Sequence, residues 1–303
     1  MRRKKDASET NKNSGERLAG FTVTENSTLL PFLMEKMPDK SRNNLKSLLR
    51  FQQVLVDGIS VSQFNHPLVA GQRIEISSQR MMVRNIDLPF ELIFEDEHLV
   101  VVNKPAGLLS IATKKEKRET LYSFVSDYVK LQNQNNKIFI VHRLDRETSG
   151  IMLFAKNEQI KVQLQEAWKE MKAERTYIAL VEGKVNEKEG VVSSFLFEDN
   201  NFRMHSSQNQ SKGQKAVTHF SVLKSNNSWS LLKINLETGR KNQIRVHMQD
   251  MGHSIAGDKK YGATTNPINR LGLHAQKLSF QHPATNQILT FESKIPRIFK
   301  KVL

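Results

Sequence analysis

A short, strongly charged loop separates two apolar segments in the middle of the chain, in the sequence IVHRLDRETSGIMLFAK of residues 140–156. The apolar segments predict two β-strands, and the polar residues between them predict a tight loop with Ser149 and Gly150 as the turn signal. The sequence therefore predicts a pair of strands that displays a cluster of charged side chains where they meet.

The loop places one carboxylate, Asp145, between Arg143 and Arg146, with His142 just before them. A carboxylate between two guanidinium groups stays ionised, so Asp145 is a candidate nucleophile or base. The arginines are also suited to holding a phosphate backbone. The alternative is an ordinary surface ion pair on a hairpin loop, which contributes little to stability.

The charge of the chain indicates the kind of partner. It carries 46 Lys and Arg against 31 Asp and Glu, a formal net charge of +15. Such an excess favours a polyanionic partner, most simply nucleic acid, although a basic protein without such a partner is the alternative. The chain has no cysteine, which excludes disulfides, thiolate metal sites and the cysteine nucleophile used by several enzymes that modify uracil.

A length of 303 residues favours roughly two domains. No apolar run approaches the length of a membrane span, and the basic N-terminal segment lacks the apolar core of a secretory signal, so we expect a cytoplasmic protein. Changes in composition predict a disordered basic tail, a small domain, a linker and a larger domain, at residues 1–18, 19–80, 81–90 and 91–303.

The small domain is predicted to contain two short helices followed by a hairpin, with the first helix ending at Pro38. Basic residues Arg42, Lys46 and Arg50 fall on the outer face of the second helix. Together with the segments VDGISVSQ and VAGQRIEI, this arrangement resembles the small RNA-binding domain first seen in ribosomal protein S-four. A small α+β domain whose basic face is merely solvated is the alternative.

In the larger domain, the unbroken apolar run 99–102 predicts a buried strand, followed by a turn that presents Lys104. Asn157 is positioned to cap a helix with one apolar face. Residues 184–214 are polar, and we expect an extended loop with short strands there. The other predicted elements are a helix, a strand and a hairpin, at residues 121–131, 175–183, 219–223 and 229–236.

Several motifs in this domain occur in a fixed order, and each is weak taken alone. They are NKPAGLLS, HRLDRETSGIMLFAK, RTYIALVEG, GQKAVTHF, TGRKNQIRVH, GDKKYG and LHAQKLSFQHP. Together they resemble the RluA family of RNA pseudouridine synthases over nearly all of residues 91–290. The resemblance implies an α+β fold in which the catalytic domain is built on a mixed, mainly antiparallel sheet.

The resemblance also implies site residues. Asp145 matches the catalytic aspartate, Tyr177 the aromatic residue that packs on the target base, and Arg245 the arginine that pairs with the carboxylate. Arg143 matches the residue that enters the RNA stack beside the flipped nucleotide. One position departs from the family pattern, because Asn242 replaces the usual histidine, which leaves a backbone or loop contact open.

RNA contacts are expected from basic residues of both domains, namely Arg143, Arg146, Lys104, Arg240, Arg42, Lys46 and Arg50. Conversion of uridine to pseudouridine transfers no electrons and adds no atoms, so no cofactor is expected. No metal is expected either, because the spacing of the histidines matches no ligand motif. Asp258 and Tyr261 are interpreted as anchors of a turn rather than as catalytic groups.

The sequence therefore predicts an RNA pseudouridine synthase that acts on structured RNA, with ribosomal RNA favoured over transfer RNA because of the S-four-like domain. Two other functions stay open at this stage. One is a non-catalytic RNA-binding or ribosome-assembly factor that retains the fold, and the other is a hydrolase that uses Asp145 as a base.

Overall fold

The computed structural model divides the chain into two compact units, Met1–Asp87 and Leu88–Leu303. The residues that it describes are 17–50, 53–77, 88–113, 116–170 and 172–303. Most of the predicted tail and most of the predicted linker therefore lie outside the described residues. The tail prediction extends too far, because strand β1 (Arg17–Thr22) includes its last two residues.

The first unit contains the two helices that the sequence predicts, α1 (Leu29–Lys36) and α2 (Arg42–Arg50). They pack through apolar side chains against a small antiparallel sheet in the order β1-β6-β3-β4. Asp57 and Gly58 form the predicted hairpin turn, and both have the positive φ that such a turn needs. The remaining strands of this unit are β2 (Ser27–Thr28), β3 (Val54–Val56), β4 (Ile59–Ser60), β5 (Pro67–Leu68) and β6 (Arg73–Ser77).

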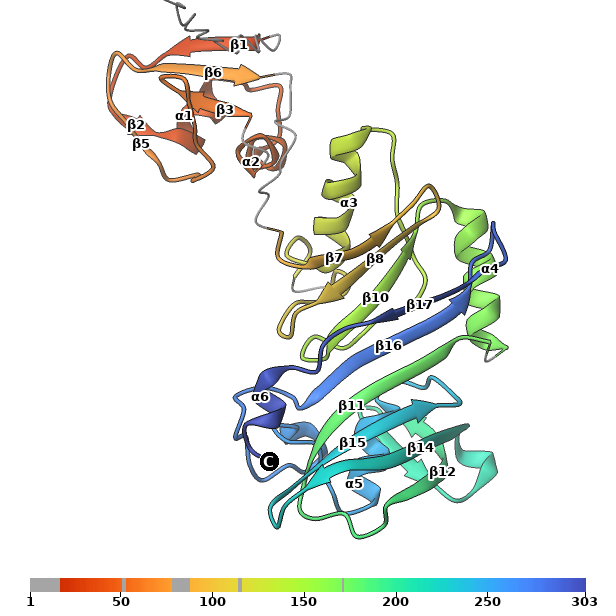
Figure 1. Ribbon diagram of the computed structural model, residues 1–303. Helices are drawn as coiled ribbons and strands as arrows, with labels where there is room; N and C mark the ends of the chain where they lie inside the picture. Colours follow the sequence, from red (N-terminus) through yellow and green to blue (C-terminus); the bar gives the residue numbers. More distant parts are fainter. Residues whose placement is uncertain (1–16, 51–52, 78–87, 114–115, 171) are drawn as a thin grey trace, which may run out of the picture. The chain divides into compact units, whose positions relative to one another are not determined.

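The second unit is built on an eleven-stranded sheet in the order β13-β12-β14-β15-β11-β16-β10-β8-β7, with β17 paired to β16 and β9 to β10 (Figure 1). Among the strands of the described residues in this unit, only β10 and β16 pair in parallel, which confirms the predicted mixed, mainly antiparallel sheet. Its strands are β7 (Glu91–Glu95), β8 (Leu99–Lys104), β9 (Phe139–Ile140), β10 (Ser149–Ala155), β11 (Glu174–Glu182), β12 (Glu189–Glu198), β13 (Met204–Ser207), β14 (Gln214–Ser225), β15 (Trp229–Leu236), β16 (Leu273–Gln281) and β17 (Ile288–Glu292).

Helices lie on both faces of the central strands of this unit (Figure 1). Alternate residues of β8 pack toward α3 and toward α4, with Val100 and Val102 on one side and Leu99 and Val101 on the other. Strands covered on both faces read as unbroken apolar runs, which explains the sequence of β8 and of β10. The helices are α3 (Leu121–Gln132), α4 (Glu158–Lys169), α5 (Gln243–Asp250) and α6 (Arg297–Lys300).

The structure corrects two local predictions. Ser149 and Gly150 are not the turn, because they begin β10, and the chain instead turns at Asp145–Thr148, where the Thr148 amide donates to the Asp145 carbonyl at 3.2 Å. The region expected to be an extended loop contains the ten-residue strand β12. Most side chains of β12 are partly or fully exposed, so its sequence lacks the apolar run that identifies a buried strand.

Gly150 lies where β10 and β16 approach most closely. It pairs with Ala275 in the parallel ladder and has a φ of +120°. A Cβ atom at this position would lie 2.2 Å from the Ala275 carbonyl oxygen, so only glycine fits without moving a strand. This close approach joins the strand after the Asp145 loop to the rest of the sheet.

We expect Gly150→Ala to lower the free energy of unfolding by about 2–5 kcal/mol, because backbone strain and a steric clash act together. Gly252→Ala is the matched control, since Gly252 has a φ of +76° but open space around its missing side chain. The control should lose only about 1–2 kcal/mol from backbone strain. Urea unfolding of both variants measures the difference, and equal losses would contradict the close-approach argument.

Candidate active site

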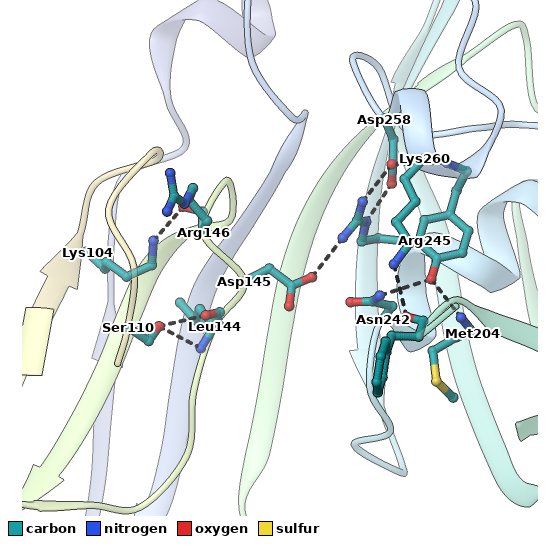
Figure 2. Close-up of polar contacts among 12 residues, drawn as sticks. Lys104, Ser110, Leu144, Asp145, Arg146, Met204, Asn242, Arg245, Asp258 and Lys260 are labelled. Atoms are coloured by element: carbon teal, nitrogen blue, oxygen red, sulfur yellow. Dashed lines mark hydrogen bonds and ion pairs between the residues drawn. The ribbon is translucent and has the colours of Figure 1, made fainter. Parts of the chain in front are cut away.

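The loop that carries Asp145 is fixed by hydrogen bonds to the segment after β8. The Ser110 hydroxyl donates to the Leu144 carbonyl at 2.6 Å and accepts from the Leu144 amide at 3.2 Å, while the Leu144 side chain is buried (Figure 2). Since Leu144 immediately precedes Asp145, these contacts fix the point from which the carboxylate projects. The position of Asp145 is thus set by the backbone around it.

Lys104 anchors the same loop and is not an RNA contact, which corrects the sequence-based expectation. Its ammonium group donates to the carbonyl oxygens of Pro105, Leu108 and Arg146 at 2.9, 2.7 and 2.9 Å, and its side chain has no exposed surface. Burial lowers the pKa of Lys104 to about 8, against the attraction of Glu147. The three N–H groups are used inside the fold, so none is available to a phosphate.

Arg245, on α5, connects Asp145 to a second carboxylate (Figure 2). Its Nη1 donates to Asp145 Oδ2 at 3.0 Å, while Nε and Nη2 bind both oxygens of Asp258 at 2.6 and 2.7 Å. Burial opposes the charge of Arg245, but the hydrogen bonds to Asp258 and the two carboxylate charges outweigh it and raise its pKa. The two hydrogen bonds to Asp258 therefore fix the direction in which the Arg245 guanidinium points toward Asp145.

Asp145 makes its ion pair with Arg245, which is 100 residues away in the sequence. Its neighbours Arg143 and Arg146 are exposed, and among the described residues neither forms an ion pair with it. The Asp145 side chain is 41% exposed, and no described residue hydrogen-bonds to its second oxygen, Oδ1. One carboxylate oxygen is thus bound by the protein, and the other is free to meet a ligand.

A cavity of about 90 Å³ lies against this carboxylate. Burial raises the pKa of Tyr177, on β11, so its ring faces the site as a neutral phenol. The lining residues are Arg143, Leu144, Asp145, Thr148, Tyr177, Leu236, Arg240, Asn242, Gln243, Ile244, Arg245 and Leu273. The cavity therefore brings together an aromatic ring, apolar walls and a charged carboxylate, a combination suited to a flat polar base.

Asn242, where the family pattern has histidine, holds a strained position before α5. Its φ is +53°, in the left-handed region that asparagine tolerates better than most residues. Its side-chain amide donates to the Tyr261 hydroxyl at 2.9 Å. The Tyr261 ring is buried and lies 4.8 Å from the Arg245 guanidinium, so Asn242 fixes a ring that supports Arg245.

The other basic residues expected to bind RNA are distributed over both units. Arg143 and Arg240 line the cavity and are exposed, although the Arg240 Nε also donates to the Lys215 carbonyl at 3.1 Å. Arg42 and Lys46 are exposed on α2 of the first unit. The Arg50 side chain lies outside the described residues. RNA binding by the exposed members of this set stays a prediction.

The sequence indicates no role for Arg175, but its surroundings in the structure are unusual. Its side chain is only 9% exposed, yet within the described part of the chain its guanidinium has no hydrogen-bond or ion-pair partner. It packs beside Gly239, where a Cβ atom would lie 2.4 Å from Nη1. A buried cation without an anion is costly. Its only sequence signal was its place before Tyr177.

Asp258 has a larger role than the turn anchor that the sequence indicated. It does anchor the turn, since it accepts from the Tyr261 amide at 3.2 Å, but it is also the buried bidentate partner of Arg245. Its side chain is 1% exposed. The sequence signal, an aspartate followed by a glycine-bounded turn, does not reveal a partner thirteen residues earlier.

His142 and His274 have structural roles. His142 accepts from the Leu153 amide at 3.1 Å and stacks on Trp168 at 5.1 Å, and burial next to Arg175 lowers its pKa to about 3. His274 bonds to two serine hydroxyls, and burial lowers its pKa to about 4. Over the described ranges, no group of three His, Cys, Asp or Glu side chains is arranged to hold a metal. No helix there is long and apolar enough to cross a membrane.

Comparison with known proteins identifies the family to which this geometry corresponds. A family model described as RNA pseudouridylate synthase matches residues 98–250. The chain is 33% identical over 270 residues to the RNA pseudouridine synthase YhcT of Bacillus subtilis, covering 86% of this chain and 88% of that protein. It is 32% identical over 314 residues to ribosomal large subunit pseudouridine synthase D of Nitrosomonas europaea, covering 97% and 89%.

A solved structure agrees with these relatives. Human RNA pseudouridylate synthase domain containing 4 superposes with a TM-score of 0.58 at 26% sequence identity. The superposition covers 69% of this chain and 90% of the human one.

Replacing Lys104 tests whether it anchors the loop or binds RNA. We expect Lys104→Met to lower the free energy of unfolding by about 1–3 kcal/mol, because buried carbonyl oxygens lose their donor. RNA affinity should stay within about twofold of the parent, since the side chain is not exposed. Lys184→Met, at an exposed position, is the control. A stable Lys104→Met protein with weakened RNA binding would contradict the anchoring role.

Proposed function

The chain belongs to the RNA pseudouridylate synthase family, and from this premise we propose that Asp145 is its catalytic carboxylate. The enzyme converts uridine in RNA to pseudouridine. One observation carries the proposal for Asp145. Its Oδ2 is bound by Arg245 while its Oδ1 has no partner among the described residues and lies at a cavity lined by Tyr177.

The reaction breaks the bond between the sugar's anomeric carbon and a ring nitrogen, and rejoins the same sugar carbon to ring carbon five. Nothing is added or removed apart from one proton, which leaves ring carbon five for solvent while another joins the freed nitrogen. The target nucleotide has to leave its stack to reach the site, which costs a few kcal/mol. Stacking of the base on Tyr177, at about 1–3 kcal/mol, offsets part of this cost.

Arg245 supports Asp145 in this scheme by orienting the carboxylate. Arg245 is itself held in place, because its other two nitrogens, Nε and Nη2, both bind Asp258. Tyr177 stays neutral because burial raises its pKa, so no second negative charge develops beside Asp145. Two first steps are consistent with this arrangement, namely attack of Asp145 on the sugar carbon and attack on the ring.

We propose ribosomal RNA as the substrate. Two relatives are named ribosomal large subunit pseudouridine synthase D. The first unit has two short helices, the second of them basic, and a hairpin, which supports the proposal that it is an S-four-like RNA-binding domain. Arg42 and Lys46 are exposed on that domain, so we expect its RNA affinity to fall steeply with salt. Transfer RNA is the alternative substrate. The cytoplasmic location stays a prediction.

Release of tritium from uridine labelled at ring carbon five tests the role of Asp145. We expect Asp145→Asn to reduce release by at least about 1,000-fold, because the amide is neither a nucleophile nor a base, while RNA affinity stays near the parent value. Asp250→Asn, on the exposed end of α5, is the control. Ribosomal and transfer RNA transcripts should be compared in parallel.

Each outcome of that assay separates the alternatives. No release from the parent protein despite tight RNA binding would favour a non-catalytic assembly factor. Free uracil or a cleaved strand would favour a hydrolase, since isomerisation leaves the strand intact and its mass unchanged. Release from transfer RNA alone would overturn the ribosomal assignment while keeping the chemistry.

A second prediction concerns the partner of Arg245. Asp258→Asn removes one charge of the bidentate pair and leaves Arg245 free to move away from Asp145. We expect kcat to fall by about 100-fold, the cost of a misplaced catalytic group, with KM changed by less than about threefold. Single-turnover kinetics measure both quantities. An unchanged kcat would show that Asp145 is oriented without the Arg245–Asp258 pair.

A further inference from the structure

The hairpin between β12 and β13 displays an aromatic ring on the protein surface. Phe202 is 73% exposed and has a φ of +58°, a left-handed conformation that is rare for a bulky side chain. An exposed ring gains nothing from burial, and the backbone strain costs about 1–2 kcal/mol. Strain of this kind, kept at an exposed residue, is typical of a functional position.

Asp199 keeps the tip of this hairpin in one shape. Its Oδ1 accepts from the amides of Asn201 and Arg203, both at 2.9 Å, and its Oδ2 pairs with His205 at 2.9 Å. These hydrogen bonds, that of the Arg203 amide first, lower the pKa of Asp199 and keep it charged. The Phe202 amide also donates to the Asp199 carbonyl at 3.0 Å. The backbone that carries the ring is therefore fixed before any ligand binds.

Two lysines lie close to Phe202. The Lys241 ammonium lies 5.9 Å from the ring centroid, and Lys260 donates to the Phe202 carbonyl at 3.1 Å. Lys241 is also paired with Glu198. Arg203 and Lys260 have no carboxylate partner in the described ranges, and the buried Nε of Arg203 has no acceptor there. The patch thus combines a flat apolar ring with unneutralised positive charge and an unused donor.

The patch adjoins the active site through Tyr261. Arg203, Lys260 and Arg245 all lie around the Tyr261 ring, at 5.4, 5.7 and 4.8 Å from its centroid. Lys241 is next in sequence to Asn242, which lines the cavity and donates to the Tyr261 hydroxyl (Figure 2). The patch and the cavity therefore share the Tyr261 ring, and an RNA strand that leaves the cavity on this side meets the patch.

We propose that Phe202, Arg203, Lys241 and Lys260 form a second nucleotide subsite, which stacks an unpaired base flanking the target uridine and holds its phosphate. The inference rests on the proposed function, since it assumes that RNA occupies the cavity. Aromatic rings among cations are the usual platform for single-stranded RNA, because every base has a face to stack and every nucleotide carries a charge. The subsite would favour targets in loops over targets in continuous helices.

Phe202→Ala tests this subsite against Ile288→Ala, which removes another exposed apolar side chain of the same unit, 78% exposed. We expect Phe202→Ala to weaken RNA binding and to raise KM by about tenfold, with kcat at saturation within about twofold of the parent. Phe202→Trp should retain parental KM, and its fluorescence should be quenched when RNA binds. Ile288→Ala should match the parent in every measurement.

The comparison also separates the subsite from the reaction. Equal RNA affinity and equal KM for Phe202→Ala and Ile288→Ala would overturn the subsite, while the tritium assay on Asp145→Asn would be unaffected. If the parent releases no tritium, filter binding of the two variants to RNA still decides whether Phe202 contacts it. Unchanged RNA binding with lost capture of a ribosomal protein would assign the ring to a protein partner and overturn the proposal.

Discussion

The ion pair between Arg245 and Asp145 is the contact on which the site depends, because it joins two parts of the chain that are far apart in the sequence. Arg245 belongs to α5, and Asp145 to the loop before β10. Asp258 occupies the other side of the guanidinium, so the arginine has no freedom to swing away. A carboxylate held through only one oxygen is both fixed in direction and open to a ligand.

The sheet supports that contact by making the Asp145 loop rigid from the other side. Ser110 and Lys104 fasten the loop backbone, and Gly150 lets β10 lie directly against β16. Burial of Lys104 is unfavourable in itself because it opposes the charge of the ammonium group. The same group, however, donates to three carbonyl oxygens that would otherwise lack donors. The rigid loop and the rigid helix meet at the cavity, where little has to reorganise when a nucleotide binds.

The positive charge of the protein is used unevenly around this cavity. Arg245 and Lys104 are hydrogen-bonded to groups inside the protein, whereas the Nε donors of Arg175 and Arg203 have no acceptor among the described residues. In the subsite that we propose, Arg203 and the exposed ring of Phe202 extend the recognition surface beyond the single uridine that reacts.

The sequence by itself determined the two short helices of the first unit, the buried strand β8 and the position of the Asp145 loop, because apolar patterns and turn residues are local signals. The mainly antiparallel sheet followed from the resemblance of its motifs to a known family. The sequence did not reveal that Lys104 is buried, that β12 is a long strand or that Asp258 holds Arg245. Those features depend on which polar groups meet after folding, and neither periodicity nor composition records such pairs. The tertiary structure brings Asp145, Arg245 and Tyr177 to one cavity, and it places the exposed ring of Phe202 near Lys241 and Lys260, which no local signal indicated.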